Sequence, residues 1–219
     1  MKQENLSLYH LVRPPKKPSE KAPLLIMLHG YGSNEEDLFA FAEELPEDLF
    51  IISLRAPYPL PPFGHAWYAI NWDNAGGKFS NDEQAIDSRE KISAFIDEAI
   101  ATYRVDAKNV TLVGFSQGCI LSHAVALSYP EKIKNVIGLS GYINQDIIKE
   151  GFQKRDFSGL SVYSSHGTQD QVIPVAWARK TAPFLDSLGI ANVYSEFPVG
   201  HGVAPQNFMG LKKWLLEHL

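Results

Sequence analysis

Short apolar runs rich in β-branched residues alternate with helical patterns along most of this 219-residue chain. Such alternation is typical of a mostly parallel β-sheet covered by helices. The strand-like runs are residues 6–12, 24–28, 50–54, 110–115, 135–139, 160–165 and 193–197. The helical patterns are residues 85–103, 117–129, 174–188 and 206–219, and a capping-box spacing predicts one more helix start at residues 33–36. We therefore predict an α/β fold with a sheet of about seven strands, helices on both faces, and residues 6–12 at one edge.

The composition narrows the class of protein. Apolar residues make up 45% of the chain and charged residues 21%, which is ordinary for a soluble globular domain, and we expect a single domain over residues 1–219. The net charge of −5 argues against a nucleic-acid partner, which would require a basic patch. One cysteine excludes an intrachain disulfide. Because we find neither a signal segment nor an apolar run of membrane-spanning length, we predict a cytoplasmic protein without a transmembrane segment.

The strongest chemical signal is the pentapeptide Gly-Phe-Ser-Gln-Gly at 114–118, between a predicted strand and a predicted helix. The G-x-S-x-G pattern is typical of a sharp strand-to-helix turn that exposes a serine hydroxyl. Side chains around such a turn must be small, and Gly114 and Gly118 meet that need. The N-terminus of the helix that follows favours a developing negative charge. Ser116 is therefore the candidate nucleophile, and the alternative is a chance match in a strand-to-helix turn.

A serine hydroxyl needs a base, and on folds with this turn the chain order is serine, acid, histidine. His201 is the predicted base, because it lies between two glycines directly after the last strand. His123 falls inside the helix after the turn, where a packing role is expected. His166 ends a strand and could support the loop that carries the acid. His218 lies near the C-terminus and is expected to be solvated.

Asp170 is the predicted acid. It follows the strand at 160–165 and precedes His201 by one strand, so both residues are expected at the same edge of the sheet. Two other acidic residues are poorer candidates for this role, because Asp186 lies within a predicted helix and Glu196 lies within a predicted strand. The alternative is that Asp170 is only a turn or helix-capping residue ahead of the next helix.

A glycine-rich string after an early strand, Leu-His-Gly-Tyr-Gly at 28–32, is a candidate oxyanion loop. Its backbone N–H groups can face the N–H of the residue after the nucleophile around a tetrahedral intermediate. On this interpretation Tyr31 and Gln117 contribute main-chain donors, and His29 positions the loop rather than transferring protons. The alternative is a plain glycine-rich turn.

Together these strings resemble the phospholipase/carboxylesterase family, which includes acyl-protein thioesterases and bacterial carboxylesterases. The matching strings are L-H-G-Y-G at 28–32, G-F-S-Q-G at 114–118, L-S-G at 139–141, H-G-T-Q-D at 166–170, V-I-P at 172–174 and G-H-G at 200–202. The resemblance implies an α/β-hydrolase fold without a large cap domain, no cofactor, and hydrolysis of short or medium acyl esters or thioesters. Gln171, where many members carry proline, and Cys119, where a small residue is usual, depart from the family pattern.

The long loop at 56–77 is rich in proline, glycine and aromatic residues, and loops of this length are often functional. Its aromatic side chains could form an apolar acyl site beside the serine, with Trp67 and Tyr68 as the candidate substrate-binding residues. The irregular segment at 141–159 is a second candidate wall. The alternative is a loop that packs onto its own surface.

The expected partner is a small-molecule ester or thioester. We predict no metal site, because no histidine, cysteine or acidic cluster has metal-ligand spacing, and the sequence is compatible with a monomer or an oligomer. Three other functions stay open. They are a lysophospholipase, a peptidase of the prolyl-oligopeptidase type, and a binding protein of the same fold with a vestigial site.

Overall fold

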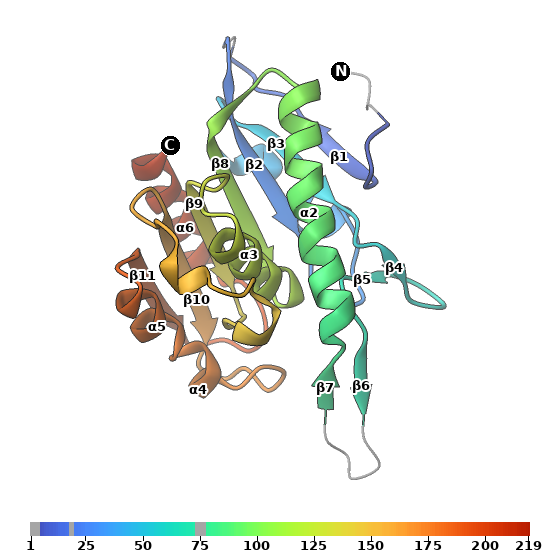
Figure 1. Ribbon diagram of the computed structural model, residues 1–219, viewed down its shortest axis with the longest axis vertical. Coiled ribbons are helices and arrows are strands. Elements are labelled where there is room, and N and C mark those ends of the chain that lie inside the picture. The colour runs from blue at the N-terminus through green and yellow to red at the C-terminus, as the bar shows by residue number, and fades with distance from the viewer. Residues whose placement is uncertain (1–4, 18–19, 73–77) are drawn as a thin grey trace.

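A seven-stranded sheet forms the centre of the computed structural model, which describes residues 5–17, 20–72 and 78–219 (Figure 1). Its spatial order is β1-β3-β2-β8-β9-β10-β11. The strands are β1 (His10–Arg13), β2 (Ala22–Leu28), β3 (Phe50–Leu54), β8 (Val105–Phe115), β9 (Asn135–Leu139), β10 (Ser161–Gly167) and β11 (Ala191–Phe197). The edge strand β1 pairs antiparallel with β3, whereas the other neighbours pair parallel. The predicted mostly parallel sheet is therefore confirmed.

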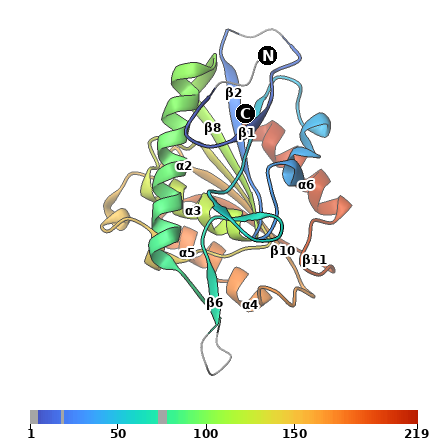
Figure 2. The same ribbon diagram turned by 90° about the vertical axis from the view of Figure 1, so that its right-hand side faces the viewer.

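Helices cover both faces of this sheet, as predicted (Figure 2). One face carries α2, α3 and α5, which pack into the larger hydrophobic core, and the other carries α1 and α6, which pack into the smaller core. The bounds of these helices are α1 (Glu36–Phe39), α2 (Asp82–Thr102), α3 (Gln117–Ser128), α5 (Thr181–Ser187) and α6 (Pro205–His218).

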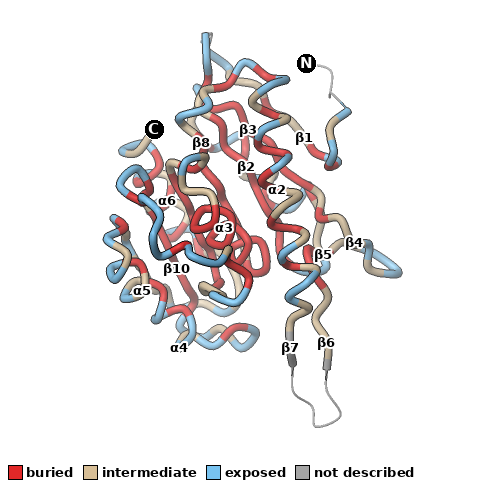
Figure 3. The backbone as a smooth tube through the Cα atoms, viewed as in Figure 1, coloured by how far each residue is buried: buried red, intermediate tan, exposed pale blue. Residues whose placement is uncertain are grey.

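The continuous apolar run of β2 shows why a strand at the middle of the sheet needs no polar side. Leu24, Ile26 and Leu28 point into the larger core. Leu25 and Met27 point into the smaller core on the opposite face, because successive side chains of a strand alternate. Helix α3 is buried along its whole length, and the tube in Figure 3 shows it over the middle of the sheet. The nucleophile candidate thus sits between the second half of β8, which is buried from Val110 to Gly114, and the fully buried α3.

The loop predicted at 56–77 and the helix predicted at 174–188 fold differently from expectation. The predicted loop at 56–77 forms the hairpin of β4 (Tyr58–Pro59) and β5 (His65–Ala66) and supplies β6 (Ile70–Trp72). Strand β6 pairs with β7 (Lys78–Ser80), which follows the loop, and residues 73–77 lie outside the described chain. The helix expected at 174–188 is divided into α4 (Val175–Ala178) and α5. Pro183 explains the division, because proline is tolerated in the first turn of a helix but disrupts a helix interior.

The capping box expected at residues 33–36 does not form. The Ser33 hydroxyl donates to Asp37 at 2.9 Å, and the Asn34 side chain accepts the N–H of Glu36 at 2.8 Å. Glu35 instead turns inward, where its buried carboxylate binds Arg55 through two hydrogen bonds of 2.6 and 2.5 Å. This ion pair connects the start of α1 to the end of β3.

Candidate active site

Ser116 occupies the sharp turn between β8 and α3, with φ 53° and ψ −115°. Positive φ is rare for residues other than glycine and marks stored strain, which gathers at functional sites. A Cβ atom on Gly114 would overlap the carbonyl of Gly118, and one on Gly118 would overlap the carbonyl of Leu28. Both flanking glycines are therefore required for the turn to close, and α3 begins directly against the end of β2.

Three residues far apart in the sequence meet at this turn. Nε2 of His201 lies 2.9 Å from the Ser116 hydroxyl, and Nδ1 of His201 lies 2.7 Å from a carboxylate oxygen of Asp170. An ionised carboxylate only accepts hydrogen bonds, so we assign the ring proton to Nδ1. Nε2 then faces the hydroxyl as an acceptor. The structure brings together the three residues predicted as nucleophile, base and acid.

The surroundings of Asp170 favour the ionised carboxylate. One oxygen accepts the backbone N–H groups of Val172 at 2.8 Å and Ile173 at 2.9 Å. The other lies 2.7 Å from His201 and 3.1 Å from Nε2 of His166. Burial alone would raise the pKa of Asp170, but the hydrogen bond from His201 and the two backbone donors lower it. Asp170 thus orients the histidine and also closes its own turn.

The remaining histidines named from the sequence lie elsewhere. His166 is buried beside Asp170, in keeping with support of the acid loop. His123 is buried within α3, and burial lowers its pKa to about 4, so its ring is neutral near pH 7. His218 is not simply solvated, because its ring stacks on Trp214 at 4.0 Å.

The candidate oxyanion loop passes directly beside the turn. A Cβ atom on Gly30 would lie 3.1 Å from the ring of Phe115 and 3.4 Å from Cβ of Ser116. Gln117 is the first residue of α3, where helical N–H groups have no intrahelical acceptor. Gly30, Tyr31 and Gln117 line the same pocket as Ser116. The two residues predicted as backbone donors therefore line one pocket together with Ser116.

Short β-type contacts hold this loop in place. The N–H of Gly32 donates to the carbonyl of His65 at 2.9 Å, and the N–H of His65 donates to the carbonyl of Ser33 at 2.8 Å. Gly32 has φ 78°, a conformation that glycine adopts without strain. The hairpin of β4 and β5 thus supports the loop that follows β2.

A pocket of about 540 Å³ contains Ser116 and His201 in its lining. Tyr68 contributes to its wall, as the sequence predicted, together with residues that sequence reasoning did not name. The apolar and aromatic lining also includes Ile70, Phe115, Ile120, Tyr142, Val172, Ile173 and Trp177. Tyr142 belongs to the irregular segment proposed as a second wall, and its ring meets Trp177 edge-on at 5.2 Å. Trp177 was missed because nothing local to α4 in the sequence marks its approach to this pocket.

Trp67 requires a correction. It was expected in the acyl wall, but its side chain is fully buried and does not line the pocket. Its indole N–H donates to the carbonyl of His29 at 2.9 Å, and its backbone N–H donates to the side chain of Gln117 at 2.8 Å. An aromatic residue in a loop can face the ligand or the protein, and the sequence pattern does not distinguish the two.

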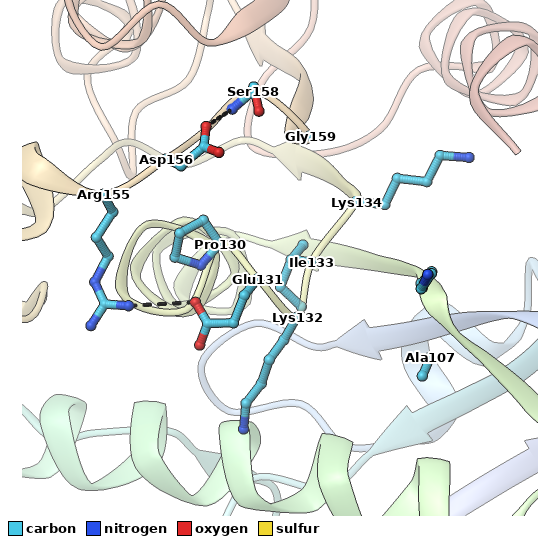
Figure 4. A pocket seen from close by; sticks show the side chains of 11 residues that line it. Ala107, Pro130, Glu131, Lys132, Ile133, Lys134, Arg155, Asp156, Ser158 and Gly159 are labelled. Carbon is cyan, nitrogen blue, oxygen red and sulfur yellow. Dashed lines mark hydrogen bonds and ion pairs between the residues drawn. The ribbon is translucent and has the colours of Figure 1, made fainter.

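A second pocket, of about 460 Å³, lies at the amino ends of β8, β9 and β10, away from Ser116 (Figure 4). Four of its charged side chains, those of Glu131, Lys132, Arg155 and Asp156, have protein partners. Arg155 pairs with Glu131 at 3.4 Å, Lys132 pairs with Asp97 at 2.6 Å, and Asp156 accepts the N–H of Ser158 at 2.9 Å. No histidine or cysteine lines it in the described chain. The reactive groups are therefore concentrated at the carboxyl ends of the strands, where α/β sheets bind ligands.

No group of three histidine, cysteine or acidic side chains among the described residues is placed to hold a metal ion. None of their helices combines the length and the apolar character needed to cross a bilayer.

These features define a protein of the α/β-hydrolase class. They are the mostly parallel sheet, the serine in its strained turn, and the aspartate and then the histidine that follow it along the chain. The model of the phospholipase/carboxylesterase family matches residues 9–219. The chain therefore belongs to the phospholipase/carboxylesterase family, which confirms the resemblance seen in its motifs.

Individual relatives extend over nearly the whole chain. Lysophospholipase-like protein 1 of Mus musculus is 25% identical, with 97% of this chain and 94% of the relative aligned. Acyl-protein thioesterase 1 of Yarrowia lipolytica is 26% identical, with 96% and 98% aligned. The esterase PE8 superimposes with a TM-score of 0.83 at 27% identity, covering 98% of this chain and 100% of that one. A carboxylesterase of Bacillus cereus superimposes with a TM-score of 0.85 at 21% identity, covering 98% of this chain and 96% of that one. At this identity the likeness shows that the two chains share a fold.

Proposed function

We propose that this protein is a serine hydrolase that cleaves carboxylic esters or thioesters of short to medium acyl chains through an acyl-serine intermediate. The observation that carries the proposal is the hydrogen-bonded chain from Asp170 to His201 at 2.7 Å and from His201 to Ser116 at 2.9 Å. Membership in the phospholipase/carboxylesterase family supports it, as do relatives named for thioesterase and carboxylesterase activity.

In the first half of the reaction, Oγ of Ser116 attacks the carbonyl carbon while Nε2 of His201 accepts its proton. The carbonyl electron pair moves to oxygen, and the backbone N–H groups of Tyr31 and Gln117 donate to the resulting oxyanion. Asp170 stays ionised, because its pKa is lowered, and it stabilises the imidazolium. Collapse of the intermediate breaks the bond to the alcohol or thiol, which leaves with the proton from His201.

In the second half, His201 accepts a proton from a water molecule that attacks the acyl-serine. A second oxyanion forms in the same place, and its collapse releases the carboxylic acid and returns the proton to Ser116. The proposal needs no metal or cofactor, because side chains transfer the proton and backbone N–H groups stabilise the oxyanion.

Turnover of two substrates tests this function. Purified protein is expected to release p-nitrophenol from p-nitrophenyl butyrate and free thiol from a butyryl thioester, and Ser116→Ala is expected to release neither above the uncatalysed rate. A wild-type protein that hydrolyses neither compound contradicts the proposal and favours a binding protein of the same fold.

We also propose a cytoplasmic location, which the single buried cysteine supports because it excludes an intrachain disulfide.

A further inference from the structure

The two proposed oxyanion donors come from segments that the chain does not connect directly. The N–H of Tyr31 belongs to the loop after β2, and the N–H of Gln117 belongs to the start of α3. An oxyanion is stabilised only if both donors are held at the position where charge develops. A structural feature that fixes the two segments relative to each other would therefore influence the proposed chemistry without touching the substrate.

The segment at Trp67 and Tyr68 lies between the two and bonds to both. The indole N–H of Trp67 donates to the carbonyl of His29, two residues before Tyr31, at 2.9 Å. On the other side, the Gln117 side chain accepts the backbone N–H of Trp67 at 2.8 Å and donates to the carbonyl of Tyr68 at 2.7 Å. One residue thus joins the loop after β2 to the first turn of α3.

The surroundings of Trp67 make this connection rigid. The side chain is fully buried, its ring packs 5.6 Å from that of His29, and its carbonyl accepts the hydroxyl of Ser88. His29 is fixed in turn, because Nε2 accepts the N–H of Ala56 at 3.1 Å while Nδ1 donates to the carbonyl of Gly30 at 2.7 Å. Burial lowers the pKa of His29, which keeps the ring neutral and Nε2 able to accept.

We propose that Trp67 is a positioning residue that sets the separation of the Tyr31 and Gln117 donors. This inference rests on the proposed hydrolase function and adds to it a residue outside the pocket. The donors act on the tetrahedral state more than on the bound ester, so loosening them should lower kcat and leave KM nearly unchanged. A displacement of about 1 Å at a reacting centre can cost about a hundredfold in rate.

The most direct variant is Trp67→Phe, which retains an aromatic ring and removes the indole N–H. With p-nitrophenyl butyrate we expect kcat to fall about tenfold or more, with KM within about twofold of wild type. Affinity for a butyl trifluoromethyl ketone, whose serine adduct carries an oxyanion, should weaken by the same factor as kcat. Trp214→Phe is the matched control, because Trp214 is also buried but packs on the opposite face of the sheet, and it should keep wild-type kcat.

A second variant covers the possibility that Trp67→Phe folds poorly. Gln117→Met keeps the backbone N–H and the side-chain length but removes both hydrogen bonds to the segment at Trp67 and Tyr68, so the same loss in kcat and ketone affinity is expected. All rates are referred to active sites titrated with a fluorophosphonate. Wild-type kcat and ketone affinity per titrated site in both variants would overturn the inference. Absence of turnover in the wild-type protein would instead contradict the proposed function.

Discussion

At the scale of single residues, the geometry around Ser116 assigns one task to each side chain. The hydroxyl of Ser116 faces an imidazole nitrogen, and the other nitrogen of that ring is oriented by a carboxylate. Groups in such a chain act as a unit rather than as independent contributors. Removing two of these groups should therefore cost little more activity than removing one.

Replacing His201 tests this coupling. His201→Ala should lower kcat for p-nitrophenyl butyrate by about a thousandfold or more, as Ser116→Ala should. The double variant should lose little beyond either single variant, because each replacement alone already disables the nucleophile. Steady-state kinetics on the three proteins checks this. Losses that multiply in the double variant would show that the two residues act independently.

Asp170→Asn tests the acid. The amide oxygen can still accept the N–H groups of Val172 and Ile173, so the turn should persist. Its NH₂ group would then face Nδ1 of His201, which moves the ring proton to Nε2 and leaves no acceptor for the serine proton. We expect kcat to fall by about ten thousandfold with the fold retained. Asp186→Asn, which changes an aspartate of α5, is the control, and a loss below tenfold in Asp170→Asn contradicts the assigned role.

At the scale of elements, α3 connects the active site to the buried middle of the molecule. All of its residues are buried, including His123, whose pKa is lowered to about 4 by burial. An unfolded chain binds a proton at this histidine below about pH 6.5, whereas the folded chain does not until about pH 4. The unfolded state therefore gains protons first, and acidification through this window destabilises the fold.

The variant His123→Leu isolates this contribution. The free energy of unfolding of the wild type should fall relative to that of the variant by up to about 1.4 kcal/mol for each pH unit between 6.5 and 4. Urea unfolding at several pH values measures the difference. Leu121→Val, on the same helix and equally buried, should lose a constant amount at every pH because it removes no titrating group. Parallel curves for wild type and His123→Leu would exclude the effect.

The helices and strands that could be predicted correctly were those with a strong local sequence pattern. The buried strand at 50–54 matched its prediction residue for residue, and α3 ended within one residue of the predicted bound. The failures have tertiary causes. Ser33 lost its capping role where Glu35 turns inward to Arg55, and that partner follows β3, which is distant in sequence.

At the candidate active site too, residues with a local sequence pattern could be predicted, and residues placed by tertiary contacts could not. Ser116, Asp170 and His201 could be selected because chain order and glycine spacing constrain them. Trp67 was misjudged, because its acceptor, the carbonyl of His29, comes from a loop distant in sequence. Trp177 reaches the pocket from α4 through the arrangement of the loops, which carries no signature of its own in the sequence.

At the scale of the whole molecule, pocket size sets the acyl preference. Each buried methylene contributes about 0.8 kcal/mol, or roughly fourfold in kcat/KM, while the pocket lasts. Tyr142 and Trp177 narrow the space beside Ser116. The kcat/KM should rise from acetyl to about butyryl or hexanoyl p-nitrophenyl esters and then level or fall. Trp177→Ala should move the optimum to longer chains, and an optimum at palmitoyl in the wild type would contradict this account.

Charge at the pocket predicts a second preference. Asp37, Asp82 and Asp146 line it, and among the described residues no lysine or arginine does. Burial and the charge of Asp146 raise the pKa of Asp82. Two carboxylates about 8 Å apart in water repel each other by about 0.5 kcal/mol, so three at such a distance from the substrate would disfavour an anionic ester by about tenfold.

Two esters with acyl chains of equal length measure this preference. The kcat/KM of mono-p-nitrophenyl succinate should be about tenfold below that of p-nitrophenyl butyrate, and the gap should narrow at high salt because ions screen exposed charges. Asp82→Asn should narrow it at low salt. Equal values for the two esters, or a gap that salt does not change, would show that these carboxylates do not select substrates.

The central claim is that Ser116 is a nucleophile activated by His201. A fluorophosphonate reacts much faster with such a serine than with an unactivated hydroxyl. The most direct measurement is therefore the mass of the intact protein after labelling, followed by mapping of the modified peptide. We expect one adduct per chain, on the peptide that contains Ser116, no adduct in Ser116→Ala, and much slower labelling in His201→Ala. An adduct on another residue, or labelling that persists in Ser116→Ala, would contradict the claim.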